Sequence, residues 1–466
     1  MNGEPDTTVM PDRLRDERGE IRPEFVQEIT AAIERADEAA LRALAADMHE
    51  ADMGALLEAL DADHRPQLIE LMGAEFDFTA LTEVDDTVRE DILEELPSET
   101  VAEGMRDLDS DDAVEILEGL PREDQDEILD QLPAEDRVAI TRSLDYPEDS
   151  AGRLMQTEII AVPPVWTVGH TIDFMRETID LPDRFFEIYI IDPAQRFLGA
   201  VPLDRLMRAQ RPVAVSDLME EDRRRVHAND DQEEVARFFE RYNLVAVPVV
   251  DSDDRLVGII THDDIVDVIS EEAEEDIKAL GGVSGEEELS DTVATIAKGR
   301  FLWLFANLLT AIAASWVIAQ FQSSIEKMVA LAVLMPIVAS MGGNAGTQTM
   351  TVAVRALATR ELSPANVGRV IRRELLVGLI NGVSFAVIMA VVAVAWFQVT
   401  DLGAVIGLSM ICVLTAAALG GIVIPLALAK LGVDPAVSSG PFVTTITDVV
   451  GFFAFLGIAT LWFGLQ

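Results

Sequence analysis

Long apolar stretches dominate the chain after about residue 300, where they are separated only by short polar segments. They cover about 301–321, 328–354, 375–398, 402–429 and 437–463. Each stretch reaches the ~20 residues that an α-helix needs to cross the hydrocarbon core of a bilayer. The pattern therefore predicts an all-α transmembrane domain of five helices over residues 299–466.

A repeat of 12 residues marks the first part of the chain. An apolar residue followed by Pro or Asp recurs at Val84-Asp85, Leu96-Pro97, Leu108-Asp109, Leu120-Pro121, Leu132-Pro133 and Leu144-Asp145. Pro or Asp at the start, with an acidic residue in the first turn, is typical of short capped helices. We predict an all-α solenoid over residues 20–150, preceded by a disordered tail over residues 1–19.

A second repeat follows, and its sequence pattern is typical of short β-strands. Residues 189–201 align without gaps to residues 248–260, and each copy reads as strand, Asp-containing turn, strand and then helix. The repeat predicts two α/β domains, at residues 151–211 and 212–270. An acid-rich segment over residues 271–298 then predicts a long connecting helix that leads to the first span.

The charge is divided as unevenly as the hydrophobicity. The whole chain has a net charge of −48, but residues 298–466 carry nine basic and six acidic residues, so the part before them carries −51. Such a surface repels phosphate backbones and excludes nucleic-acid binding. With only four lysines among the basic residues, most of the acidity reads as adaptation of a halophilic protein to concentrated salt. The alternative is that some of the carboxylates bind cations.

The positions of the basic residues around the spans predict the orientation. Lys298 and Arg300 precede the first span, and five arginines lie between Arg355 and Arg373, after the second. By the positive-inside rule, the N-terminus is cytoplasmic and the C-terminus extracellular in a multi-pass protein of the cell membrane. The single Cys412 excludes an internal disulfide, and we expect no enzymatic activity.

One acidic residue stands well inside the fifth span. A central Asp such as Asp448 costs roughly 2.5–3.5 kcal/mol on insertion scales, and Thr444 and Gly451 share its helix face. This combination predicts a cation path, and the alternative is a protonated structural carboxyl group. Oxygen ligands without His or thiolate favour a hard cation such as Mg²⁺.

The second span contains Gly342-Gly343-Asn344-Ala345-Gly346-Thr347-Gln348. These residues could loosen the helix and expose backbone carbonyl groups beside water. Gly342 and Gly346 also form a small-xxx-small pair that allows close helix packing. The sequence leaves both interpretations open.

Carboxylates are stacked on one helical face directly before the connecting segment. Asp264, Asp267 and Glu271 follow at spacings of three and four residues, where like charges repel each other. The face is either a solvated surface or a cation sensor.

Taken together, these features resemble the MgtE-type magnesium channels and transporters, in which tandem cystathionine-β-synthase (CBS) domains are the regulatory α/β pair. The matching motifs are Pro336…Gly342–Gln348 in the second span, Asp434-Pro435-Ala436…Asp448 at the fifth, and Glu274-Glu275-Asp276 in the connecting or "plug" helix. The resemblance implies a homodimer in the lipid bilayer with a pore lined by spans two and five. It also implies that a pore site for hydrated Mg²⁺ is formed by Asp448, Asn344, Gly342, Gly343 and Thr444.

The same resemblance implies regulation by the transported ion. Sensor carboxylates carried over by position are Asp264, Asp267, Glu272, Glu275, Asp276 and Asp434, while those of the solenoid cannot be assigned because the repeat makes its register ambiguous. Thr261 and Asp264 match the T-x-x-D pattern that binds ribose in CBS domains, which implies an ATP site; the first copy has Pro202 and Arg205 there instead.

The expected function is a magnesium-selective, channel-like importer that cytosolic Mg²⁺ closes. Two alternatives remain: a transporter for another divalent cation such as Co²⁺, and a membrane-anchored CBS sensory protein without transport. Five spans and an intramembrane Asp448 disfavour the anchor, since one span would suffice for that purpose.

Overall fold

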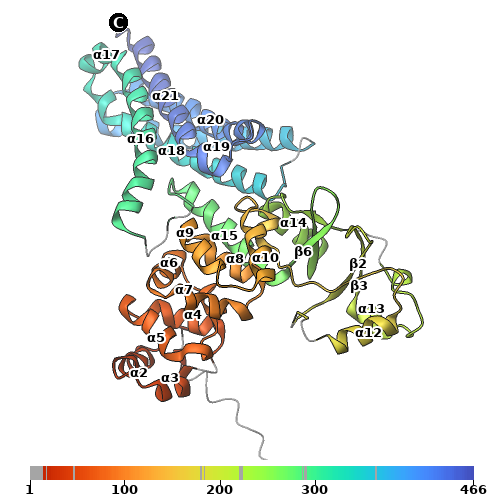
Figure 1. The fold of residues 1–466 in the computed structure, drawn as a ribbon. Helices are drawn as coiled ribbons and strands as arrows, with labels where there is room; N and C mark the ends of the chain where they lie inside the picture. Colours follow the sequence, from red (N-terminus) through yellow and green to blue (C-terminus); the bar gives the residue numbers. More distant parts are fainter. Residues whose placement is uncertain are drawn as a thin grey trace, which may run out of the picture. The chain divides into compact units, whose positions relative to one another are not determined.

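The computed structural model describes all residues except 1–13, 17, 46–47, 179–180, 183, 220–223, 286, 288–290, 363–364 and 466. It divides into two compact units, Met1–Glu272 and Ala273–Gln466, which are described separately below (Figure 1).

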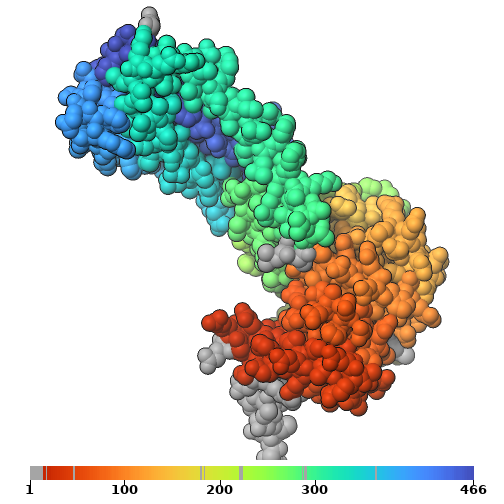
Figure 2. Space-filling model, turned by 90° about the vertical axis from the view of Figure 1, so that its left-hand side faces the viewer, coloured from red at the N-terminus to blue at the C-terminus, as the bar shows by residue number. Residues whose placement is uncertain are grey.

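The first unit begins with the predicted helical solenoid. Its helices are α2 (Pro23–Glu34), α3 (Glu38–Ala45), α4 (Glu50–Ala59), α5 (Arg65–Met72), α6 (Asp86–Glu95), α7 (Ser98–Gly104), α8 (Ser110–Glu118), α9 (Arg122–Leu129) and α10 (Ala134–Leu144). In space-filling view they form one continuous surface, coloured red to orange (Figure 2). Of the predicted tail, residues 1–13 and 17 lie outside the described part, whereas Leu14 packs against the solenoid core.

The 12-residue repeat has a simple structural cause. Its Pro or Asp is the residue directly before a helix, as Pro97 is for α7, Pro121 for α9 and Pro133 for α10. The preceding leucine is buried in the common core, as at Leu96, Leu120 and Leu132. These three repeats therefore each contribute one core leucine and one helix start, whereas Asp145 of the last repeat follows the end of α10.

Two small sheets of identical topology confirm the predicted CBS pair. One contains β1 (Ala161–Val162), β2 (Glu187–Ile191) and β3 (Phe197–Pro202), and the other β4 (Val226–His227), β5 (Ala246–Val250) and β6 (Leu256–Thr261). In each sheet the first strand pairs parallel and the third antiparallel with the middle strand. The helices are α11 (Ala151–Leu154), α12 (Val168–Glu177), α13 (Leu203–Arg208) and α14 (Gln232–Tyr242).

The connecting helix differs from its expected bounds. Helix α15 spans His262–Leu280, so it begins in the second CBS domain and ends well before residue 298. Gly282, at φ +74°, takes the left-handed conformation, and the Val283 N–H donates to the Lys278 carbonyl oxygen at 3.1 Å. This is the hydrogen-bond pattern that closes a helix at glycine. The next helix starts only at Val293.

The second unit contains the membrane helices. Among the described residues, five helices are long and apolar enough to cross a membrane: α16 (Val293–Ala319), α18 (Val329–Ala358), α19 (Val367–Phe397), α20 (Thr400–Lys430) and α21 (Pro435–Phe463). The short α17 (Gln322–Lys327) joins the first two. Helix α20 is central and packs against α18, α19 and α21.

Helices α18 and α21 are both continuous despite their glycines and prolines. Neither the glycine-rich stretch nor Pro336 interrupts α18, and α21 continues through Pro441. Neighbouring helices and local adjustments make such residues tolerable inside a membrane helix, so α18 is not interrupted at the stretch that the sequence suggested could loosen it.

Candidate functional site

The glycines of α18 lie where three membrane helices meet. A methyl group on Gly342 would come within 2.6 Å of Val413 Cγ1 on α20 and 3.5 Å of Thr447 Cβ on α21. One on Gly346 would come within 2.8 Å of Val443 Cγ1 on α21. Both glycines are buried. In this structure Gly342 and Gly346 thus serve close packing, one of the two interpretations left open by the sequence.

Gly343 has the opposite surroundings, because a Cβ atom there would have no neighbour within 4 Å. Thr447, which touches Gly342, directly precedes Asp448, so Gly343 and Asp448 lie at one level of the α18–α21 pair. Asp448 is half-buried, and Thr444, one turn before it, is exposed. A carboxylate, a hydroxyl group and an unobstructed backbone are therefore available together at the middle of two packed membrane helices.

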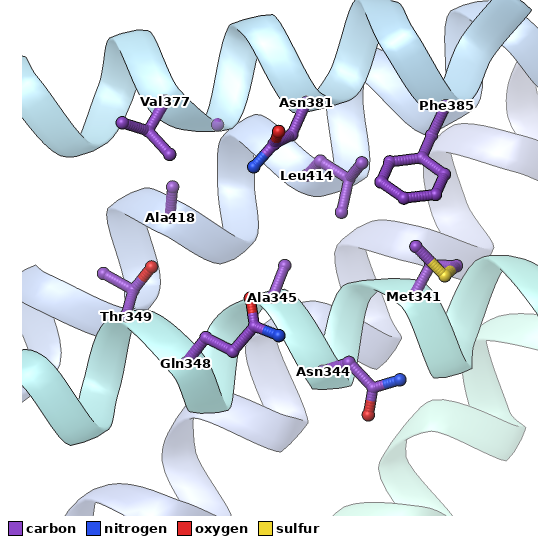
Figure 3. A pocket seen from close by; sticks show the side chains of 11 residues that line it. Met341, Asn344, Ala345, Gln348, Thr349, Val377, Asn381, Phe385, Leu414 and Ala418 are labelled. Carbon is purple, nitrogen blue, oxygen red and sulfur yellow. The ribbon is translucent and has the colours of Figure 1, made fainter.

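Asn344 is exposed and belongs to a cavity of about 190 Å³ between α18, α19 and α20. The cavity is also lined by Gln348 and Thr349 of α18 and by Asn381 of α19 (Figure 3). Sequence reasoning missed Asn381, although an amide in the middle of an otherwise apolar span was a visible signal.

In the first unit, carboxylates of the solenoid face those of α15. Desolvation raises the pKa of Asp111 well above its usual value, and the charges of Asp264 and Asp112 raise it further. The pKa of Asp112 rises to about 7, mainly through desolvation and then through Asp264. Desolvation also raises the pKa of Asp264 to about 6. We call this meeting of α8 with the start of α15 the acidic interface.

Glu115 extends the acidic interface toward Glu271. Desolvation raises the Glu115 pKa to about 7, and Arg89 lowers it in part. Because 47 % of the Glu115 side chain is exposed, solvent moderates its charge more than the raised pKa suggests. Arg89 is buried, with a side chain 7 % exposed, and it pairs with Glu115 at 2.8 Å and with Asp86. Thus one buried cation already offsets some of the repulsion.

On either side of these carboxylates, the solenoid and the CBS pair also contact each other directly. These contacts are hydrogen bonds and an ion pair, and they need no metal ion. The Ser110 hydroxyl at the start of α8 donates to Glu158 Oε2 at 2.8 Å, and the Thr157 N–H donates to the Ser110 hydroxyl at 2.7 Å. Arg153 Nε lies 3.5 Å from Glu118 Oε1. The solenoid is therefore docked on the CBS pair by hydrogen bonds around a repulsive centre.

The remaining sensor candidates are placed differently. Asp267 lies near Glu83, whose pKa is raised by desolvation and then by the charge of Asp267. Glu272 accepts a hydrogen bond from Gln232 at 2.9 Å. Glu275 packs over Gly285, and Asp434 caps α21 by accepting from the Ala436 N–H at 2.7 Å. Asp276 lies on α15 next to Glu275.

Across the described part of the chain, no three carboxylate, imidazole or thiolate groups converge to hold a metal ion alone. A divalent ion at the acidic interface would therefore be shared by few protein ligands and would keep much of its water, as Mg²⁺ commonly does.

Within the second unit, the C-terminal end of α15 contacts α18 and α21. Ala279 is buried in a cluster with Met350 and Val354 of α18 and with Ala436 and Val443 of α21. The helix that carries the acidic interface at its start is thus packed at its end on the two helices that hold Gly343 and Asp448.

The predicted ribose-binding pair occurs at the junction of β6 and α15. The Thr261 N–H and hydroxyl donate to Asp264 Oδ2 at 3.2 and 2.8 Å. The same Asp264 also faces Asp111 and Asp112, so one carboxylate belongs to both predicted sites.

Five membrane-length helices, a half-buried intramembrane carboxylate and an attached CBS pair define a multi-pass membrane transport protein with a regulatory part. Family models match at three places: "Divalent cation transporter" at residues 335–458, "MgtE intracellular N domain" at 48–149 and "CBS domain" at 215–271.

Individual relatives agree with these matches. The magnesium transporter MgtE of Enterococcus faecalis is 36% identical over 69% of this chain and 71% of its own length. The Thermus thermophilus protein of the same name is 37% identical over 68% and 70%. A solved cytosolic domain of the Mg²⁺ channel MgtE in complex with ATP covers 52% of this chain and 99% of its own, at 30% identity and a TM-score of 0.49. The chain belongs to the MgtE family of magnesium transporters.

Proposed function

We propose that this protein is a magnesium-selective, channel-like importer whose pore lies along α18 and α21. The observation that carries the proposal is Asp448, a half-buried carboxylate at the level of the open Gly343 backbone. The names of the relatives support Mg²⁺ as the ion. With Thr444 and Asn344 nearby, the site offers oxygen ligands to an ion that stays largely hydrated.

Import follows from charge. With the cytoplasmic side negative, each divalent ion gains about 4.6 kcal/mol at 100 mV, twice the single-charge value. The cytoplasmic N-terminus expected from the positive-inside rule places the acidic first unit on the side where imported Mg²⁺ accumulates.

We infer that this first unit closes the pore when cytosolic Mg²⁺ is high. The raised pKa values of Asp111, Asp112 and Asp264 show that their ionised forms are disfavoured when the solenoid is docked. A divalent ion between them offsets this cost and stabilises docking. Since α15 connects this interface to Val354 and Ala436, docking restrains the pore helices.

The homodimer implied by the family fits the exposed apolar faces of the membrane helices, such as Trp316, Val391 and Phe442. We also propose one ATP site, in the second CBS domain, because Thr261 and Asp264 are held together there and the first domain lacks the pair. A nucleotide there would share Asp264 with the acidic interface.

The proposal for the pore is tested with Asp448→Ala in reconstituted vesicles. We expect Mg²⁺ uptake to be abolished while the protein still assembles, because the intramembrane charge that holds the ion is lost. Asp401→Ala is the matched control, since this exposed Asp lies in the first turn of α20. Normal uptake by Asp448→Ala would remove Asp448 from the mechanism, and uptake of Co²⁺ in preference to Mg²⁺ by the wild type would favour the alternative transporter.

The sensor is tested by neutralising Asp264, Asp267, Glu275 and Asp276 together. Uptake should then continue at internal Mg²⁺ concentrations that stop the wild type. A control of equal charge change neutralises Glu123, Asp124, Asp126 and Glu127, which are exposed on α9. Unchanged inhibition in the first variant, or equal loss of inhibition in both, would show that the four residues only solvate the surface.

A further inference from the structure

The cavity between α18, α19 and α20 carries polar groups that the pore site does not use. Besides Asn344, three of its side chains are polar and come from two helices: Gln348 and Thr349 of α18 and Asn381 of α19. Figure 3 shows the Asn381 amide extending from α19 toward α18, with Ala418 and Leu414 of α20 lining the cavity between them.

These groups lie at membrane depth without protein partners. Asn381 is near the middle of α19, which spans Val367–Phe397. For Asn381, Gln348 and Thr349, all of them described residues, the structure contains no side-chain hydrogen bond to another protein group. Asn381 and Gln348 are exposed and Thr349 is partly buried, and an unsatisfied polar group in hydrocarbon is costly, so these groups are open to hydrogen bonds from water or from a hydrated ligand.

The cavity lies on a different side of α18 from the open face at Gly343. At roughly 100° per residue, Ala345 and Gln348 are about 200° and 140° around the helix from Gly343. Asn344 lies between the two faces: it lines the cavity, but its amide turns away from α19 in Figure 3. The cavity is thus beside the pore face and separated from it by α18 itself.

The volume suits a particular occupant. A cavity of about 190 Å³ has room for several waters, and Mg²⁺ keeps several waters of its octahedral shell when it binds. The waters of such an ion donate hydrogen bonds, and the amide and hydroxyl oxygens of Asn381, Gln348 and Thr349 can accept them. Neutral acceptors bind weakly enough for the ion to leave again.

We propose that this cavity is a hydrated side chamber in which Asn381, Gln348 and Thr349 hold a divalent cation through its water shell, beside the α18–α21 path. This inference rests on the proposed transport of Mg²⁺, and it adds a second, outer-sphere site to the one at Asp448. It makes Asn381 of α19 a residue of the transport machinery.

The chamber is tested by thiol labelling, for which the chain offers a simple background. Its single cysteine is replaced by Cys412→Ser, and Asn381→Cys is compared with Ile380→Cys on the neighbouring residue, which is 64% exposed in this chain. A charged methanethiosulfonate reagent reacts with ionised thiols in contact with water. We expect Asn381→Cys to react at least tenfold faster than Ile380→Cys. Equal rates of labelling would contradict the proposal that the cavity is hydrated.

Occupation by an ion is tested by protection of Asn381→Cys. Cobalt(III) hexaammine matches hydrated Mg²⁺ in shape and does not exchange its shell, so it should slow labelling at least threefold. Labelling unaffected by cobalt(III) hexaammine would overturn the cation site.

Uptake provides the second measurement. Asn381→Leu should lower Mg²⁺ uptake at least fivefold, whereas Asn381→Gln, which keeps the amide, should retain most of it. Asn307→Leu, on an exposed amide of α16 that does not line the cavity, is the control and should be normal. Absence of Mg²⁺ uptake in vesicles with the wild-type protein would contradict the proposed transport function. Normal uptake by the wild type together with equal uptake by Asn381→Leu would contradict only the proposed side chamber.

Discussion

Adding one methyl group at Gly421 should force α18 and α20 apart. A Cβ atom at this position would lie 2.7 Å from the Gly346 carbonyl oxygen, 2.8 Å from Thr349 Cβ and 3.1 Å from the Met350 nitrogen. Two of these three atoms belong to the backbone, so no side-chain rotation can relieve the contact.

The size of the effect follows from these distances. Ordinary contact begins at 3.4 Å, so the Gly421→Ala variant must displace α18 by about 0.7 Å or accept the overlap. Overpacking of this kind costs roughly 1–3 kcal/mol. At about 2–4 °C per kcal/mol for a unit of this size, the midpoint of thermal unfolding should fall by roughly 2–12 °C.

The assay measures the midpoint of thermal unfolding of the purified protein. The observable is the fraction of protein that remains monodisperse after heating to each temperature. Gly420→Ala is the matched control on the same helix, because its nearest neighbour, Ile446 Cγ2, would be at an ordinary 3.6 Å. That control should match the wild type. Equal midpoints for Gly421→Ala and Gly420→Ala would refute the close approach of α18 and α20.

The acidic interface gives two further predictions. In chelator, docking of the solenoid on the CBS pair, measured by energy transfer between labels on the two domains, should strengthen as the pH falls from 8 to 6. The docked pKa values are about 7 for Asp112 and about 6 for Asp264; raised values mean that the docked form binds protons more tightly, so its stability grows as these groups protonate. Weaker docking at pH 6 would contradict this reasoning. Arg89→Met should raise the Mg²⁺ concentration at which the channel is half-closed about fivefold, or ~1 kcal/mol, because it removes a buried cation from the acidic interface. Arg137→Met, which removes the arginine of an exposed ion pair with Asp130, should leave that concentration unchanged.

The sequence predicted the features that depend on local pattern. Five apolar stretches became five helices because length and hydrophobicity decide whether a segment can cross a membrane. The 12-residue repeat appeared as helix starts because Pro and Asp act within their own turn. The doubled sheet followed from a gap-free internal alignment.

Features that depend on contacts between residues far apart in the chain could not be predicted from the sequence. Asp111 and Asp112 could not be chosen among the solenoid carboxylates, because only the packed structure brings α8 to Asp264. Glu272 was carried over by position from the family resemblance, and only the structure shows that it accepts a hydrogen bond from Gln232. Asn381 could be seen in the sequence as an amide within an apolar span, but only the packed structure places it with Gln348 on one cavity.

Helix α15 can be considered as a lever. With 19 residues it is about 28 Å long, and Gly282 ends it sharply, so its C-terminal end does not continue as a helix into α16. From Asp264 to Ala279 the helix rises about 22 Å, so a tilt of ~5° about Asp264 moves Ala279 by roughly 2 Å, a little over a third of the 5.4 Å pitch of a helix. Because Ala279 is packed against Met350 and Val354 of α18 and against Ala436 and Val443 of α21, a stiff helix of this length turns a small change of its own angle into a displacement of about 2 Å at that contact.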